Sequence, residues 1–127
     1  MISRLTKTAR IAYLSLLGLF FAGIFTQVYL AGLAAVAKKI TWTTHIEVGY
    51  LVPLPLLLML IIMFPAKVSR RAKWMTFLLL VVLIVQVLLI WFRTDLPFIS
   101  ALHPVLALVD FLLAWWLGRQ VWAQMKI

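Results

Sequence analysis

Four long apolar stretches, separated by short polar segments, dominate the hydrophobic pattern of this sequence. They cover about residues 11–36, 45–64, 74–92 and 101–122. A helix rises about 1.5 Å per residue, so each stretch is long enough to cross a hydrocarbon layer of about 30 Å. Leu, Val, Ile and Phe fill the stretches without the strict alternation of barrel strands. The pattern predicts an all-α integral membrane protein, an up-down-up-down four-helix bundle.

The composition agrees with this pattern and excludes several classes of protein. Of 127 residues, 66% are hydrophobic and 12% are charged, whereas soluble domains are about 45–50% apolar and about 25% charged. A water-soluble globule is therefore excluded, and the length predicts a single transmembrane domain over residues 1–127. The chain has no cysteine, which excludes disulfides, thiolate metal sites and iron–sulfur clusters. Although the net charge is +9, so apolar a chain is not expected to bind nucleic acid; its partner is the lipid bilayer.

The positions of the basic residues predict the orientation of the four helices. Nine of them lie in the N-terminal tail, between the second and third stretches, or at the C-terminal end: Arg4, Lys7, Arg10, Lys67, Arg70, Arg71, Lys73, Arg119 and Lys126. Three lie in the other two loops: Lys38, Lys39 and Arg93. The first apolar run exceeds the roughly 7–15 residues of a signal peptide, so we interpret it as a retained helix. The charge bias then predicts a multi-pass protein of the bacterial inner membrane with both termini cytoplasmic.

Polar side chains within a membrane span are costly and therefore informative. With the predicted orientation, most of them fall in the outer half of the bundle, and every helix contributes at least one: Gln27, His45, Glu47, Gln86, His103 and Asp110. The inner half of the spans is almost purely Leu, Ile, Val, Met and Phe. The few polar positions therefore predict one polar site toward the outer face.

The two histidines suggest a specific chemistry for this site. His45 and His103 are predicted at matched depth on the second and fourth helices, which are diagonal neighbours in such a bundle. Opposed imidazoles there are candidates for the two axial ligands of a haem iron. Gly49 lies one turn from His45, and its missing side chain would let a flat macrocycle approach the helix. Lys39 and Arg93, with Lys38, are the cations available to haem propionates at the outer surface.

Other interpretations of the same residues remain open. Each imidazole needs a hydrogen-bond partner, and Gln27, Gln86 and Glu47 are candidates for it. The two glutamines could equally form interhelical hydrogen bonds without any cofactor, and a histidine at a helix end is often only an interfacial residue. Asp110 could be a proton-linked group, the partner of another bundle residue such as Gln86, or simply protonated.

Proline positions predict two local features. Pro53 and Pro55 should bend the second helix just below the histidine level. Pro104 indicates that the fourth helix, or a new segment of it, begins at about His103. The start of the helix would then fix the orientation of the His103 side chain.

The leading hypothesis is a small b-type haem protein that transfers electrons within or beside a larger membrane redox complex, or to and from a quinone. The alternative is a cofactor-free accessory subunit that packs in a membrane complex. A third option is a small enzyme or carrier that uses Asp110 for proton-coupled work. A di-iron site is excluded because the chain has only three acidic residues and no Glu-x-x-His pair.

Four short segments carry a resemblance to a known family. They are Thr26–Gly32, His45–Gly49, the single Gln86 and Ala101–Pro104. These segments resemble a widespread bacterial family of small four-span membrane proteins, catalogued as a domain of unknown function, over nearly the whole chain. The arrangement also looks like a distant, minimal version of membrane b-type cytochromes with histidine ligands on facing helices. The resemblance implies a polar site built from Gln27, His45, Gln86 and His103.

Overall fold

The structure, a computed structural model, describes residues 2–125, and all regular secondary structure in that range is helical. The elements are α1 (Arg4–Ala35), α2 (Trp42–Gly49), α3 (Pro53–Ile62), α4 (Arg70–Leu89), the 3-10 helix η1 (Ile90–Phe92), α5 (Pro97–Ser100) and α6 (His103–Gln124). They form four spans long and apolar enough to cross a membrane: Arg4–Ala35, Trp42–Ile62, Arg70–Phe92 and Pro97–Gln124. The predicted fold class is confirmed. Lys126, counted above among the charges that predict orientation, lies outside the described residues.

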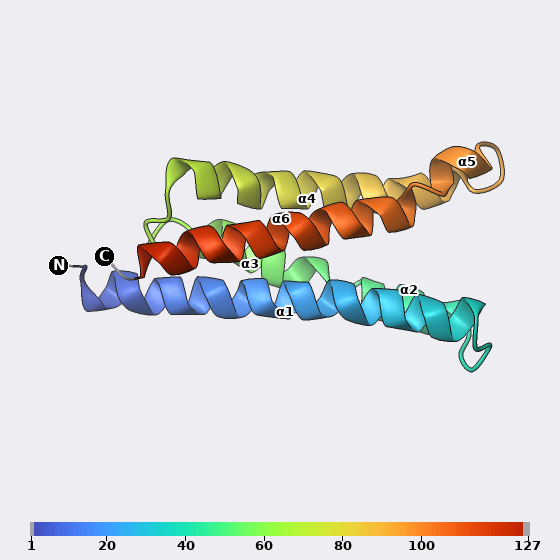
Figure 1. The fold of residues 1–127 in the computed structure, drawn as a ribbon, viewed down its shortest axis with the longest axis horizontal. Helices are drawn as coiled ribbons and strands as arrows, with labels where there is room; N and C mark the ends of the chain where they lie inside the picture. The colour runs from blue at the N-terminus through green and yellow to red at the C-terminus, as the bar shows by residue number, and fades with distance from the viewer. Residues whose placement is uncertain (1, 126–127) are drawn as a thin grey trace.

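The four spans pack as an antiparallel bundle (Figure 1). α1 packs against α2, α3 and α6, and α4 packs against α3 and α6. The second and fourth spans are therefore diagonal neighbours, as are the first and third. The start of α1 and the end of α6 lie at the same end of the bundle (Figure 1). Which side of the membrane this end faces stays a prediction from the charge bias.

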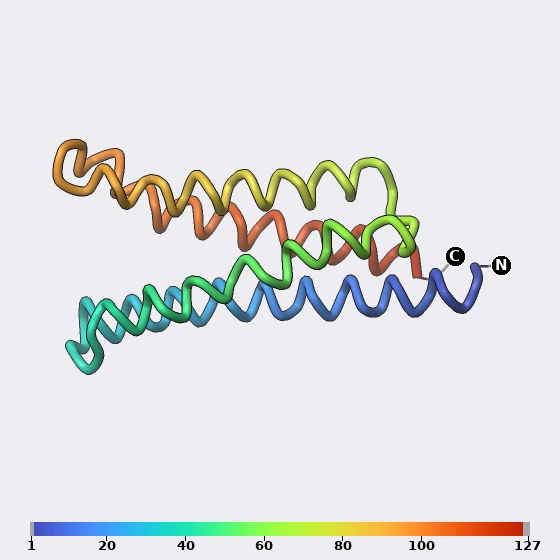
Figure 2. Tube along the Cα trace, turned by 180° about the vertical axis from the view of Figure 1, so that it is seen from behind, coloured from blue at the N-terminus to red at the C-terminus, as the bar shows by residue number. Residues whose placement is uncertain are grey.

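The two ends of the bundle differ in character. We call the end with the chain termini the basic end, and its described cations are Arg4, Lys7, Arg10, Lys67, Arg70, Arg71, Lys73 and Arg119. We call the opposite end, where α2 and α5 lie, the histidine end. Toward the histidine end, the pair α1–α2 and the pair α4–α6 diverge (Figures 1 and 2). The helices pack most closely in the middle of the bundle and toward the basic end, where most of the fully buried side chains lie: Tyr13, Phe20, Leu56, Met59, Leu79, Leu117 and Val121.

Serine caps start two of the helices outside their apolar stretches. The Ser3 hydroxyl accepts a hydrogen bond from the Thr6 backbone N–H, and the Ser69 hydroxyl accepts one from that of Ala72. Such caps pair backbone N–H groups that would otherwise be unsatisfied at a helix start. As a result α1 begins at Arg4 and α4 at Arg70, several residues before the predicted spans. Hydropathy identifies the apolar part of each helix, whereas capping determines where the helix begins.

The second span is interrupted where the prolines predict a bend. α2 ends at Gly49 and α3 begins at Pro53. Pro53 has no N–H for the Gly49 carbonyl, which instead accepts from Val52 N–H at 3.3 Å. Likewise the Leu51 carbonyl, without a donor at Pro55, accepts from Leu54 N–H at 3.2 Å. Tighter turns thus satisfy both carbonyls, and the break separates the short α2 from the well-packed α3. In the fourth span, the helix start that Pro104 predicts is also confirmed, because α6 begins at His103.

Candidate functional site

One polar residue from each span contributes to a cluster at the histidine end. Gln27 comes from α1, His45 from α2, Gln86 from α4 and His103 from α6. The two imidazole rings lie with their centroids 6.5 Å apart and their planes at 67°. Both histidines are half-buried. We call these four residues the histidine cluster. It brings together residues that lie as much as 76 positions apart in the sequence (103 − 27).

Each imidazole is oriented by a backbone carbonyl of a neighbouring helix. His45 Nδ1 lies 3.1 Å from the Gln27 carbonyl oxygen, and His103 Nδ1 lies 2.7 Å from the Gln86 carbonyl oxygen. A carbonyl oxygen only accepts hydrogen bonds, so Nδ1 of each ring must donate. In the neutral rings the hydrogen is therefore on Nδ1, and Nε2 carries the free lone pair. Within residues 2–125, Nε2 of neither ring has a hydrogen-bond partner.

The end of α4 explains why the Gln86 carbonyl is free to accept from a histidine. In a regular α-helix this carbonyl would accept from Ile90 N–H. Here the chain tightens into η1, and Ile90 N–H bonds to the carbonyls of Val87 and Leu88 instead. His103 Nδ1–H takes the place of the missing donor. The two glutamines were predicted as partners of the imidazoles, and they are their partners, but through main-chain oxygen and not through the side-chain amide.

The amide side chains of both glutamines retain unpaired polar atoms. Gln27 Nε2 and Gln86 Oε1 are buried and have no hydrogen-bond partner among the described residues. The Gln27 amide lies against Gly49, where an added Cβ would be 3.3 Å from Gln27 Oε1. The missing side chain of Gly49 thus makes room for the Gln27 amide. Burying an unpaired amide atom costs free energy. The two amides could therefore form further hydrogen bonds with a polar group bound at the cluster.

Asp110 lies below the cluster on the His103 helix. Its side chain is fully buried, at 0% exposure, and neither carboxylate oxygen has a partner within residues 2–125. A position seven residues after His103 is two turns farther along the same face of α6, about 10 Å deeper. The structure therefore does not pair Asp110 with Gln86, one of the alternatives considered for it. An unpaired carboxyl group in such surroundings is expected to be neutral.

Three other predicted residues lie on the surface at the histidine end. Glu47, Lys39 and Arg93 are all exposed, so Glu47 is not the partner of an imidazole. The structure adds a neighbour that the sequence did not single out. The Trp42 ring meets the His45 ring edge-on, with centroids 5.6 Å apart, because both lie in the first turn of α2.

The ligand inventory limits what metal chemistry this site can support. Residues 2–125 contain no group of three or more His, Cys, Asp or Glu side chains placed to hold a metal ion. A zinc ion bound by protein side chains takes three or four of them. Two histidines suffice only where a bound group supplies the other coordination positions, as a porphyrin does for haem iron.

Fold and site together define a small four-span helical membrane protein with a pair of histidines near one end. The chain belongs to the Family of unknown function (DUF6220), whose model matches residues 27–95. The match includes Gln27, His45, Gly49 and Gln86, and ends before His103. No curated protein and no solved structure matches the chain.

Proposed function

We propose that the histidine cluster binds a b-type haem through His45 and His103, and that the protein serves electron transfer within or beside a larger membrane redox complex. The observation that carries this proposal is the adjacent pair of imidazoles, 6.5 Å apart between ring centroids and supplied by two diagonal spans. Haem b in such a site supplies one-electron oxidation and reduction of its iron.

The separation of the rings would allow His45 and His103 to hold one metal-containing group between them. Metal–imidazole bonds are about 2.0–2.1 Å long, and each ring centroid lies about 1.2 Å behind its nitrogen, so two rings that share one metal would have centroids up to about 6.4 Å apart. The distance in the structure is 6.5 Å. The ring planes cross at 67°, and His45 and His103 would each hold the iron of a bound haem through one ring nitrogen.

The tautomers also support the proposal. Both Nδ1 atoms donate to main-chain carbonyls, which leaves Nε2 as the metal-binding nitrogen of each ring. Hydrogen bonding through the other nitrogen is the usual way in which a ligating histidine is held in orientation. Because both acceptors are helix backbone, this orientation does not depend on a mobile side chain. Lys39 and Arg93, exposed at the same end, are available to carboxylate groups of the cofactor.

The direct test is an absorption spectrum. The chain is expressed with an adequate haem supply, purified in a mild detergent, and measured in oxidised and dithionite-reduced forms. We expect a Soret band and reduced α and β bands, at one haem per chain. His45→Ala and His103→Ala should each lose most of the haem, and the double variant should lose all of it. Glu47→Ala is the matched control, since Glu47 is exposed on the same helix as His45, and it should keep the wild-type spectrum.

Two results would overturn the proposal. One is the absence of a Soret band in wild-type protein whose circular dichroism shows folded helices. The other is full haem retention by the double histidine variant. Normal assembly of that variant with a co-purifying membrane partner would instead favour the cofactor-free accessory subunit.

A further inference from the structure

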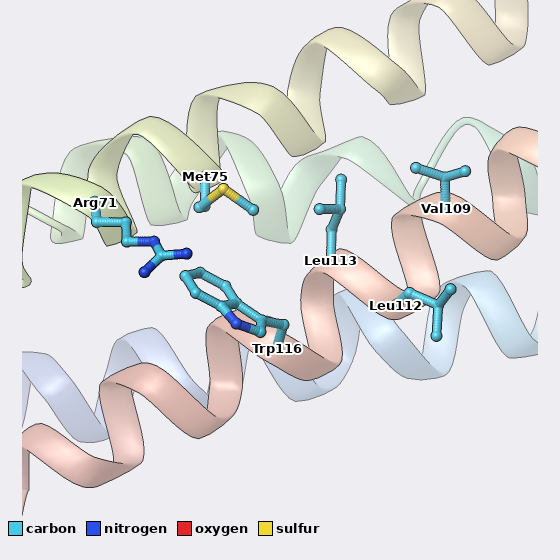
Figure 3. A pocket seen from close by; sticks show the side chains of 6 residues that line it. All are labelled: Arg71, Met75, Val109, Leu112, Leu113 and Trp116. Carbon is cyan, nitrogen blue, oxygen red and sulfur yellow. The ribbon is translucent and has the colours of Figure 1, made fainter.

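A shallow groove between α4 and α6, on the outside of the bundle, runs from Arg71 at the basic end toward the middle of the bundle. Its volume is about 460 Å³, and six residues line it: Arg71, Met75, Val109, Leu112, Leu113 and Trp116. Figure 3 shows Arg71 reaching from α4 toward the Trp116 ring on α6, while Met75, Leu113 and Val109 follow the groove away from it. The groove therefore has one cationic end and an apolar length.

The cation is held in place and has no carboxylate partner among residues 2–125. The Arg71 guanidinium carbon lies 4.6 Å from the centroid of the Trp116 ring, within the range of a cation–π contact. The acidic residues of the chain are Glu47, Asp95 and Asp110. The first two lie at the histidine end and the third is buried, so the described residues of the basic end include no acidic side chain. The donors of Arg71 are free to meet an anion from outside the protein.

The apolar part of the groove points along the bundle axis into the membrane. On α6 its residues stand at positions 109, 112, 113 and 116, a spacing that places them in one stripe along a helix. From Trp116 to Val109 the stripe extends about 10 Å. On α4, Arg71 and Met75 are one turn apart and share a face. A ligand that fits must carry a negative group at headgroup level and an apolar chain that runs toward the bilayer centre.

We propose that this groove is a binding site for one anionic phospholipid, with the phosphate on Arg71 and an acyl chain along Met75, Leu113 and Val109. Charge complementarity favours this ligand, because eight described cations at the basic end stand without acidic side chains. Guanidinium groups bind phosphate through paired, charge-assisted hydrogen bonds. The indole of Trp116 supplies the amphipathic surface that is common at the level of lipid headgroups. The site is separate from the histidine cluster and does not depend on haem.

Native mass spectrometry of the full chain in neutral detergent tests this site. The protein is titrated with phosphatidylglycerol or with phosphatidylcholine of the same acyl chains. We expect one phosphatidylglycerol to bind at least tenfold more tightly than phosphatidylcholine. Arg71→Gln should remove most of this preference. Arg70→Gln is the matched control, because it removes the same charge from the adjacent exposed position outside the groove, and it should retain the preference.

The remaining measurements distinguish a specific lipid-binding site from nonspecific electrostatic attraction. Leu113→Gln should weaken phosphatidylglycerol binding without any change in charge, and glycerol phosphate without acyl chains should not compete. Equal losses in Arg71→Gln and Arg70→Gln would overturn the proposal, since only the summed charge would then matter. Equal binding of the two lipids, or full competition by glycerol phosphate, would overturn it as well. Circular dichroism and a single elution peak establish that each variant is folded.

Discussion

Arg10 is predicted to be the most important charged residue for the stability of the bundle. It is a basic residue on a membrane-spanning helix, yet it is only 9% exposed. Its Nε donates to the Ala66 carbonyl at 3.0 Å, and its Nη1 donates to the Gln124 carbonyl. Ala66 lies in the connection after α3, and Gln124 is the last residue of α6. One guanidinium on α1 thus joins the ends of two other spans.

The size of the effect follows from these two contacts. A hydrogen bond to a charged group contributes about 1.5–3 kcal/mol. The Ala66 contact is buried, whereas the Gln124 contact is part-buried. Water would therefore compensate for part of the loss of the Gln124 contact. We therefore expect Arg10→Met to lower the free energy of unfolding by about 2–4 kcal/mol. Arg10→Lys keeps the charge but lacks the planar fork, and should lose about half of that amount.

Reversible unfolding by SDS in mixed micelles, followed by far-UV circular dichroism, measures the change. Lys7→Met is the matched control, since Lys7 is an exposed cation one turn earlier on the same helix. Both methionine variants lose one positive charge from the same end of the bundle. Any effect of this charge on the membrane orientation of the protein is therefore the same in both. If Arg10→Met were no less stable than Lys7→Met, the inferred role of the two carbonyl contacts would be refuted.

Three further predictions concern stability and use the same unfolding assay. In a double-mutant cycle of Tyr13→Phe and Thr76→Val, the two hydroxyls, 2.5 Å apart, should show a coupling of about 0.6–1.7 kcal/mol; additive effects would argue against the contact. Asp110→Leu should raise the free energy of unfolding by about 1–2 kcal/mol, because it removes a buried carboxyl without a partner; destabilisation would indicate a partner for the carboxyl. Lys67→Gly should stabilise by about 0.5–1 kcal/mol, because Lys67 adopts a φ of 48° that glycine tolerates. Lys67→Ala, which removes the same charge, should not stabilise.

The fold was predictable from the sequence because membrane spans follow from a few strong signals. Long apolar runs cannot fold in water, and short connections leave few topologies. The break in the second span was predictable for a similar reason, since Pro53 lacks a backbone N–H. The helix ends were less predictable. They depend on caps such as Ser3 and Ser69, which lie outside the apolar stretches, and hydropathy does not register them.

The sequence predicted which residues form the site, but not which of their atoms make the hydrogen bonds. Two histidines and two glutamines in the outer half of the bundle indicated one cluster, and the structure brings all four together. No sequence pattern showed that main-chain carbonyls would orient the rings, because that depends on the tightening of α4 into η1 at Ile90. Arg10 was counted only as a charge that reports orientation. Its burial became visible only when α1, α6 and the connection after α3 were placed together.

This difference between side chain and main chain leads to a prediction at Gln86. If the amide of Gln86 oriented His103, Gln86→Leu would release the ring and the proposed haem with it. In the structure the acceptor is the carbonyl oxygen at 2.7 Å, which leucine also has. We therefore expect Gln86→Leu to keep the wild-type haem-to-protein ratio, whereas His103→Ala loses the haem. The variant should also be at least as stable as the wild type in SDS unfolding, because the buried Gln86 Oε1 has no partner to lose. Haem loss from a folded Gln86→Leu protein would show that the amide itself contacts the cofactor or the ring, and that the main-chain contact alone does not hold the ligand.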